Sequence, residues 1–242
     1  MWSFLTSLTS PKKFSYLSNK LIPWLTCTFI LLLSYGVTGG LLLAPADYMQ
    51  GDGFRIIYVH APAAFLSLFI YAIMAGAAIS AIIFRLKLAF LVIRHSAPIG
   101  AGFTLLALIT GSLWGKPMWG TWWIWDARLT SELILLFLYG GIILLQSALA
   151  QKRSGERALA ILVLVGFVDI PIIHYSVYWW NTLHQGATLK LLEPSAIDGS
   201  MLYPLLAMMA AFLIYYALIL CLRMRHELIV INNNPHWLQE NS

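Results

Sequence analysis

Two of the six histidines, His60 and His184, are the residues whose type and setting best suit metal chemistry. Each lies at the edge of a long apolar run, and His60 directly precedes Ala61-Pro62. Neutral imidazole binds transition metals, and two imidazoles can fill both axial positions of an iron whose other ligands are porphyrin nitrogens. A bare zinc or copper site would need further ligands. His174 is the one nearby candidate for that alternative.

Tryptophans crowd the sequence between these two histidines. Residues 114–126 read WGKPMWGTWWIWD and carry Trp114, Trp119, Trp122, Trp123, Trp125 and Asp126. An aromatic belt at the membrane surface accounts for Trp179 and Trp180 as well as a binding role does. It accounts less well for five indoles so close together. If residues 119–126 form an interfacial helix, i, i+3 and i+4 spacing places Trp119, Trp122, Trp123 and Asp126 on neighbouring faces. Such an aromatic surface suits a large flat ligand with anionic edges.

Five charged residues have roles that depend on their surroundings. Arg55 and Arg128 can meet the carboxylates of such a ligand, because guanidinium groups match carboxylates in geometry. Asp126 can cap a helix, pair with Arg128, or accept a hydrogen bond from an imidazole or indole. Glu132, four residues after Arg128, is expected to form an i, i+4 ion pair with it, which would be weak if exposed. Asp169 is expected inside a span, where an acid is costly, and we favour a structural role beside the nearby proline over a functional one.

The elements that position these residues are set by an extreme composition. The chain has 242 residues, of which 60% are hydrophobic and only 10% charged. A soluble domain usually has roughly 25% charged residues, and a disordered chain is also rich in charge. Two cysteines are too few for a disulfide-stapled secreted module. The sequence therefore predicts a polytopic membrane protein, and its net charge of +5 is explained by membrane topology, with no nucleic-acid partner.

Six apolar runs reach the length of about 20 residues that a membrane-spanning helix needs. They lie near residues 21–43, 61–84, 96–113, 129–150, 158–178 and 201–222. The first run is too long for the core of a signal peptide, so we expect it to be a span. An even number of spans places both termini on one side of the membrane. The fold class predicted is all-α, with six transmembrane helices.

Basic residues give the orientation. With both termini in the cytoplasm, eleven of the fifteen lysines and arginines lie inside and four lie outside, namely Arg55, Lys116, Arg128 and Lys190. This agrees with the positive-inside rule. We therefore predict one membrane domain over 1–242, with a cytoplasmic lead-in at 1–20 and a cytoplasmic tail at 223–242. The outer loops are expected at 44–60, 114–128 and 179–200.

The run from Trp114 to Asp126, flanked by His60 and His184, resembles the tryptophan-rich WWD signature of the haem-handling protein superfamily. In length, number of spans and position of the signature, the chain is similar to the six-span branch of that superfamily, the cytochrome c maturation protein C family, also called haem exporter protein C. The resemblance implies a haem carrier of the bacterial inner membrane. Its haem site would be the loop at 114–128 on the periplasmic side.

The resemblance also implies specific roles and partners. His60 and His184 would be the axial ligands of a non-covalently held haem b, and the haem platform would comprise Trp114, Trp119, Trp122, Trp123, Trp125 and Asp126. We expect Arg55 or Arg128 at the haem propionates. The implied partners are the haem chaperone cytochrome c maturation protein E, the ATP-binding cassette (ABC) pair cytochrome c maturation proteins A and B, the small single-span cytochrome c maturation protein D, and membrane lipid.

The same signature leaves two alternative functions open. Two axial histidines leave no open iron position for oxygen activation, so we expect a carrier and not an enzyme. A b-type electron-transfer subunit also uses paired histidines, but its ligands normally lie within the helical bundle. A haem-transporting permease is the other alternative, although the sequence shows no inverted repeat.

Overall fold

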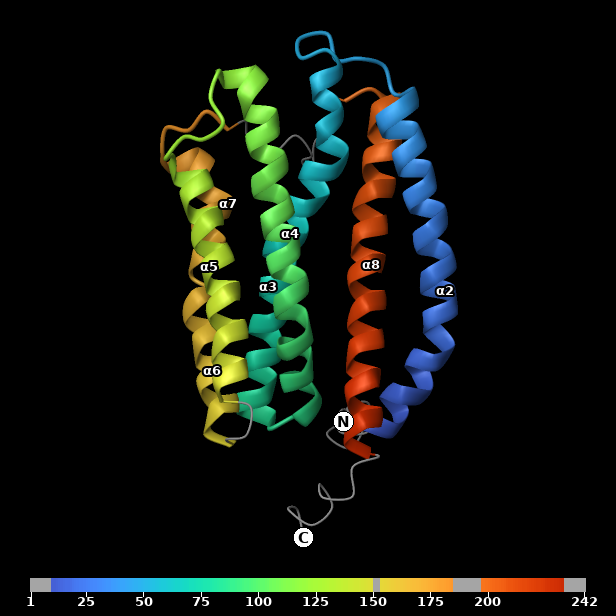
Figure 1. The fold of residues 1–242 in the computed structure, drawn as a ribbon, viewed down its shortest axis with the longest axis vertical. Coiled ribbons are helices and arrows are strands. Elements are labelled where there is room, and N and C mark those ends of the chain that lie inside the picture. Colours follow the sequence, from blue (N-terminus) through green and yellow to red (C-terminus); the bar gives the residue numbers. More distant parts are fainter. Residues whose placement is uncertain (1–9, 150–152, 185–196, 233–242) are drawn as a thin grey trace.

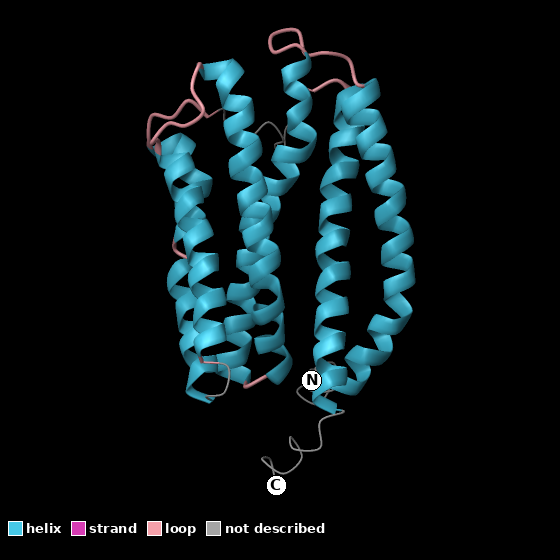
Figure 2. Cartoon of the chain, in the orientation of Figure 1, coloured by secondary structure: helices cyan, strands magenta, loops and turns pink. Residues whose placement is uncertain are grey.

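The computed structural model describes residues 10–149, 153–184 and 197–232. This part of the chain is helical, with turns and loops between the helices and no strand (Figure 2). Six helical segments in it are long and apolar enough to cross a membrane: Pro11–Leu43, Asp52–Phe84, Leu88–Trp119, Ala127–Ala148, Gly155–Trp179 and Gly199–Ile231. The prediction of an all-α fold with six spans is confirmed.

Figure 1 shows the helices arranged as two groups. The first contains α3 (Ile57–Phe84), α4 (Lys87–Trp119), α5 (Ala127–Ala148), α6 (Arg153–Gly166) and α7 (Asp169–Trp179). The second contains α2 (Pro11–Val37) and α8 (Gly199–Asn232), which pack along each other. A short π-helix η1 (Thr38–Leu43) extends α2, and a 3-10 turn η2 (Asp52–Ile56) leads into α3. Contacts of α8 with α3 and α4 join the two groups.

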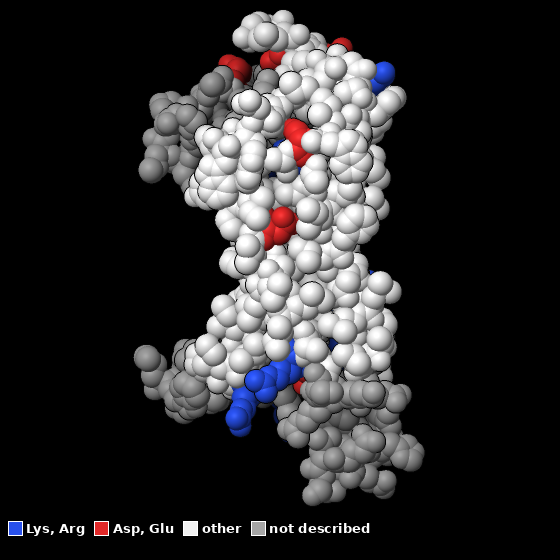
Figure 3. Space-filling view, turned by 90° about the vertical axis from the view of Figure 1, so that its left-hand side faces the viewer, with Lys and Arg blue, Asp and Glu red and all other residues white. Residues whose placement is uncertain are grey.

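The two ends of this bundle differ in composition. Pro11 and Asn232 lie at one end, together with the turn between α3 and α4, and we call this the basic end (Figure 1). The loops at 44–51 and 120–126 lie at the other end, which we call the histidine end. On the face displayed in Figure 3, lysine and arginine gather towards the basic end, and most of the surface between the two ends is uncharged.

The fifth span is broken in its middle. A continuous helix would need a backbone N–H at Pro171, which proline lacks, and its ring would crowd the carbonyl of Phe167. The helix stops at Gly166 and restarts at Asp169, and the Ile170 N–H donates to the Phe167 carbonyl at 3.1 Å. Asp169 is therefore buried at the first position of α7, and one of its carboxylate oxygens has no hydrogen-bond partner.

The core between α3 and α5 contains a polar network. The Tyr139 hydroxyl donates to the Ser67 carbonyl at 2.7 Å, and the Ser67 hydroxyl donates to Glu132 Oε1 at 2.7 Å. Glu132 is only 6% exposed. The predicted ion pair between Glu132 and Arg128 is not found among the described residues, and the carboxylate is paired with Ser67 instead. The position of Glu132 on the inner face of α5 places its carboxylate against α3, where burial requires the hydrogen bond from Ser67.

Several predicted segments fall partly outside the described residues. The lead-in at 1–20 is described from Ser10, and α2 already begins within it at Pro11. The tail at 223–242 is described to Asn232, as the end of α8. The third outer loop is described at 179–184 and 197–200, so Lys190 lies outside the described part.

Candidate functional site

The imidazoles of His60 and His184 lie side by side at the histidine end. Their ring centroids are 6.0 Å apart, and the ring planes are tilted by 51°. His60 is in the first turn of α3, and His184 follows the end of α7. Two imidazoles that share one metal through bonds of about 2 Å place their centroids roughly 6 Å apart. The fold thus brings together two residues that are distant in sequence, at a spacing that suits a shared metal ion.

The His60 ring is held by α4. Its Nδ1 lies 3.1 Å from the Ala107 carbonyl oxygen and 3.0 Å from Thr110 Oγ1. The Thr110 hydroxyl itself donates to the Leu106 carbonyl at 2.7 Å. Because both neighbours of Nδ1 are then acceptors, we assign the ring proton to Nδ1. This leaves Nε2 with a free lone pair, and a second-sphere hydrogen bond of this kind typically orients a metal-ligating histidine.

The α4 helix has a glycine, Gly111, at the position that faces the His60 ring. A Cβ atom on Gly111 of α4 would lie 3.1 Å from His60 Cε1, closer than ordinary packing allows. The glycine therefore lets the imidazole lie directly on the α4 backbone.

His184 is held through its backbone. Its N–H donates to Thr182 Oγ1 at 2.9 Å, and the Thr182 hydroxyl donates to Asp126 Oδ2. Asp126 Oδ1 accepts the Leu129 N–H at 2.8 Å, so the same carboxylate caps the N-terminus of α5. Of the three roles considered for Asp126, the structure contains the helix cap. It also contains a link to the His184 loop through Thr182.

The surroundings of His184 keep its imidazole neutral. Burial, with a smaller effect from the positive charge of Arg128, lowers the pKa of His184 to about 4, while Asp126 acts in the opposite direction. The ring is therefore unprotonated at neutral pH, as a metal ligand must be. Its Nδ1 is buried without a hydrogen-bond partner. A neutral ring with an unpartnered nitrogen, whose centroid lies 6.0 Å from that of His60, fits an iron-porphyrin ligand set.

Two tryptophans flank the histidine pair. The Trp114 ring meets the His60 ring edge to face at a centroid distance of 5.7 Å, and Trp119 meets His184 at 5.8 Å. The Trp114 indole N–H donates to Gln50 Oε1 at 2.9 Å, which ties α4 to the first loop of the histidine end. The four rings form one continuous cluster in the order Trp114, His60, His184, Trp119.

The interfacial helix considered for residues 119–126 is absent. Instead α4 continues through Trp119 and ends at Gly120, whose φ of 79° is the left-handed conformation that glycine adopts most readily. Residues 120–126 form a loop that ends at the Asp126 cap. Trp114 and Trp119 are therefore positioned by helix α4, whereas the tryptophans after Gly120 are positioned by the loop.

The loop tryptophans present the exposed part of the aromatic surface. Trp122 is 55% exposed and Trp125 is 74% exposed. The ring of Trp123 meets that of Trp125 at 5.4 Å, and its indole N–H is buried without a partner. Lys116 lies over the Trp122 ring at 5.8 Å. The loop thus offers open aromatic faces and one unused donor.

The two predicted arginines are placed differently. Arg128 donates to the Ile173 carbonyl at 2.9 Å, and its positive charge helps to lower the pKa of His184. Arg55 pairs with Asp52 at 2.9 Å, and its guanidinium also reaches two carbonyl oxygens of η1. Arg128 therefore belongs to the histidine site, whereas the contacts of Arg55 brace η1 against η2.

Sequence reasoning missed the side chains that support the histidines. Thr110 lies one helical turn before Trp114, and this i, i+4 spacing on a helix was a usable signal. Thr182, two residues before His184, fits the spacing of a local hydroxyl turn. Neither Gln50 nor Gly111 carried a signal of this kind.

The alternative of a bare metal site finds no support in these residues. Across 10–149, 153–184 and 197–232, no group of three or more histidine, cysteine or acidic side chains is positioned to hold a metal ion. His174 makes its ring contact with Tyr175, at 4.8 Å, and not with the histidine pair.

Known proteins match this chain over nearly its whole length. A family model described as "Heme exporter protein C" matches residues 4–239. The chain is 48% identical to "Heme exporter protein C" of Escherichia coli K12 over 99% of its length and 97% of that relative. The proteins of the same name from Haemophilus influenzae and Bradyrhizobium diazoefficiens are 47% and 44% identical, over 99% and 93% of this chain and 97% and 85% of their own.

Proposed function

Because the chain belongs to the haem exporter protein C family, we propose that it holds haem for cytochrome c biogenesis through His60 and His184. The observation that carries the proposal is the pairing of the two imidazoles, 6.0 Å apart at one end of the bundle. Haem b would be bound without covalent attachment, and the iron would take one nitrogen from each ring. Bis-imidazole ligation fills both axial positions, so the protein stores and transfers haem and does no chemistry at the iron.

The neighbouring residues support the porphyrin in this proposal. Trp114 and Trp119 flank the two ligands, and the loop tryptophans provide an aromatic surface for the macrocycle. Arg128 is the better of the two arginines for the propionates, because its charge acts on His184, whereas Arg55 is paired with Asp52. The unpartnered indole N–H of Trp123 is a further donor for an anionic group. Arg55 contributes indirectly, since it holds the η1 and η2 segments beside α3.

The location of the site favours transfer to another protein. Trp122 and Trp125 leave their faces open at the end of the bundle. We propose that this end faces the periplasm and presents haem to the chaperone cytochrome c maturation protein E. The chain would act in an inner-membrane assembly with the ABC pair, cytochrome c maturation proteins A and B, and with the small cytochrome c maturation protein D. A site at the end of the bundle also argues against a b-type electron-transfer subunit, whose haem lies between its helices.

The test is haem binding by purified protein in which each ligand is replaced separately. His60→Ala and His184→Ala should each lose the six-coordinate absorption spectrum and retain less haem. A matched control is His174→Ala, because that histidine lies on α7 away from the paired rings and should leave spectrum and haem content unchanged. An unaltered spectrum in both ligand variants would refute the assignment, and so would an equal loss in the His174→Ala control.

A further inference from the structure

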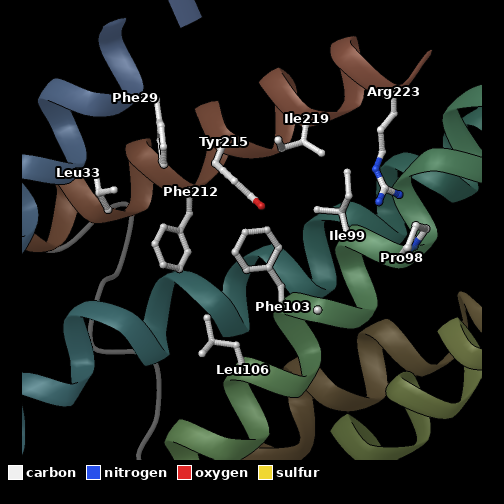
Figure 4. A pocket seen from close by; sticks show the side chains of 11 residues that line it. Phe29, Leu33, Pro98, Ile99, Phe103, Leu106, Phe212, Tyr215, Ile219 and Arg223 are labelled. Atoms are coloured by element: carbon white, nitrogen blue, oxygen red, sulfur yellow. The ribbon is translucent and has the colours of Figure 1, made fainter. Parts of the chain in front are cut away.

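A cavity lies between α2, α4 and α8, and neither His60 nor His184 lines it. Its volume is about 470 Å³. Figure 4 shows apolar side chains from all three helices turned towards it. Aromatic rings line much of its wall: Phe103 meets Phe212 at a centroid distance of 5.3 Å, and Phe29 meets Tyr215 at 5.5 Å. All three helices are membrane-spanning candidates, so the cavity lies at the depth of the lipid chains.

One cation marks an end of this cavity. Helix α8 begins at Gly199, and Arg223 is its first charged residue. Its side chain turns into the cavity (Figure 4). No hydrogen bond or ion pair joins its guanidinium to another residue of the described part of the chain. A smaller hollow of about 360 Å³, lined by His95, Leu222, Arg223 and His226, adjoins the same side chain.

The volume, the lining residues and the single cation of the cavity indicate which kind of molecule it can bind. A partner helix has a diameter of about 10 Å, which is too bulky for a space of 470 Å³. None of the lining residues is a histidine, cysteine or methionine, the ligands that hold the iron in most haem proteins. An acyl chain needs apolar walls and nothing more. A phosphate attached to that chain would meet the unpaired guanidinium at the level of the lipid headgroups.

We propose that this cavity binds an anionic phospholipid, with one acyl chain between α2, α4 and α8 and the phosphate at Arg223. The lipid would fill the space between the α2–α8 pair and α4. It would then join the two helix groups at the basic end, where their direct packing is incomplete. The proposal does not depend on haem binding or on the orientation of the chain in the membrane.

The test is competitive lipid binding in nanodiscs, followed by native mass spectrometry of the released protein. Phosphatidylglycerol and phosphatidylcholine with identical chains are the probes. The wild type should retain phosphatidylglycerol in preference. Arg223→Gln should reduce that preference about fivefold, equivalent to about 1 kcal/mol for one basic side chain near the headgroups. Arg225→Gln, on the same helix but outside the cavity lining, is the charge control and should bind as the wild type does.

A second variant tests the acyl-chain site. Gly102 lines the cavity, and a Cβ atom there would meet no other atom within 4 Å, so the side chain of Gly102→Phe can extend from the helix into this space. It should lose both lipids. Gly140→Phe on α5, also at a glycine with open surroundings, should lose neither.

Four outcomes would overturn the proposal. The wild type could retain the two lipids equally, or Arg223→Gln could leave the preference unchanged. Gly102→Phe could retain lipid, or the mass spectrum could contain a bound protein helix in place of lipid. Haem content distinguishes this proposal from the haem site. Both cavity variants should keep the haem spectrum of the wild type, and haem lost from Gly102→Phe but kept by His60→Ala would place haem in the cavity instead.

Discussion

The proposed ligands His60 and His184 are held in place by two different means. A carbonyl of α4 fixes the proton of His60 on Nδ1, whereas the His184 loop is fixed through its backbone and its ring is kept neutral by burial and by Arg128. Both arrangements leave an uncommitted ring nitrogen, which is the state that iron ligation needs. Single substitutions around these two rings should therefore weaken the proposed haem binding without unfolding the protein.

The contact of His60 with Gly111 gives the first prediction. A Cβ atom at position 111 would lie 3.1 Å from His60 Cε1, so Gly111→Ala must push the imidazole away from α4. We expect haem affinity to fall about tenfold, because displaced second-sphere contacts typically cost at least that much in metal affinity. Titration of haem-free protein with haem measures it. Gly102→Ala on the same helix is the matched control, and equal affinities in the two variants would contradict the role given to Gly111.

The pKa of His184 gives the second prediction. The unfolded chain binds a proton at this residue at about pH 6.5, whereas the folded protein does so at about 4. Between these values the unfolded state holds more protons, so the free energy of unfolding should fall as the pH drops from 6.5 to 4. Nuclear magnetic resonance (NMR) titration of histidine-labelled, haem-free protein should place the ring transition near pH 4.

The variant Arg128→Gln checks the cause of that shift. Removal of the positive charge should raise the pKa of His184 towards its ordinary value, because Arg128 is one of the groups that lower it. A wild-type transition near pH 6.5 would mean that the ring is solvated, and His184 would then not be the neutral, buried ligand described above.

At the scale of elements, α4 does most of the positioning. It supplies the carbonyl and hydroxyl at His60, the glycine behind that ring, and both Trp114 and Trp119. The N-terminus of α5 then reaches the loop after α7 through Asp126 and Thr182. These links hold together segments that a sequence pattern treats separately.

The link between α5 and the His184 loop gives the third prediction. Thr182→Val keeps the shape of the side chain but removes the hydroxyl that joins Asp126 to the His184 N–H. We expect haem affinity to fall by about one to two orders of magnitude. Thr182→Ser restores the hydroxyl and should restore most of the affinity, as measured by the same haem titration. If the valine variant binds haem as the wild type does, the link has no part in holding His184.

The sequence predicted these elements well where hydrophobicity decides them. All six spans were found, because a run of about 20 apolar residues is required to cross the bilayer. Their ends were not, since α2, α4 and α8 continue beyond the apolar runs. The helix considered at 119–126 was wrong because a glycine in the left-handed conformation outweighed the spacing of the tryptophans. The candidate ligands were found by residue type, whereas their supporting contacts depend on tertiary packing that no spacing encodes.

At the scale of the whole molecule, six spans bring every site element to one end. The loops after η1, α4 and α7 all lie at the histidine end, and the first and last described residues lie at the other (Figure 1). The positive-inside rule predicts that the basic end faces the cytoplasm. On this prediction the proposed haem site would lie on the periplasmic side.

The orientation gives the fourth prediction. In a chain with Cys27 and Cys221 replaced by alanine, Tyr48→Cys places a thiol at a position that is 94% exposed at the histidine end. A membrane-impermeant maleimide should label it in intact spheroplasts. Lys13→Cys, exposed at the basic end, should be labelled only after the membrane is permeabilised. The reverse pattern would place the histidine site in the cytoplasm.

The most direct measurement of the central claim is pulsed electron paramagnetic resonance of the ferric haem complex of protein labelled with ¹⁵N-histidine. The paired imidazoles predict coupling of the iron to two histidine nitrogens in the wild type. His60→Ala and His184→Ala should each retain coupling to one. A wild-type spectrum with fewer than two couplings, or one that neither substitution changes, would contradict ligation of one iron by both histidines.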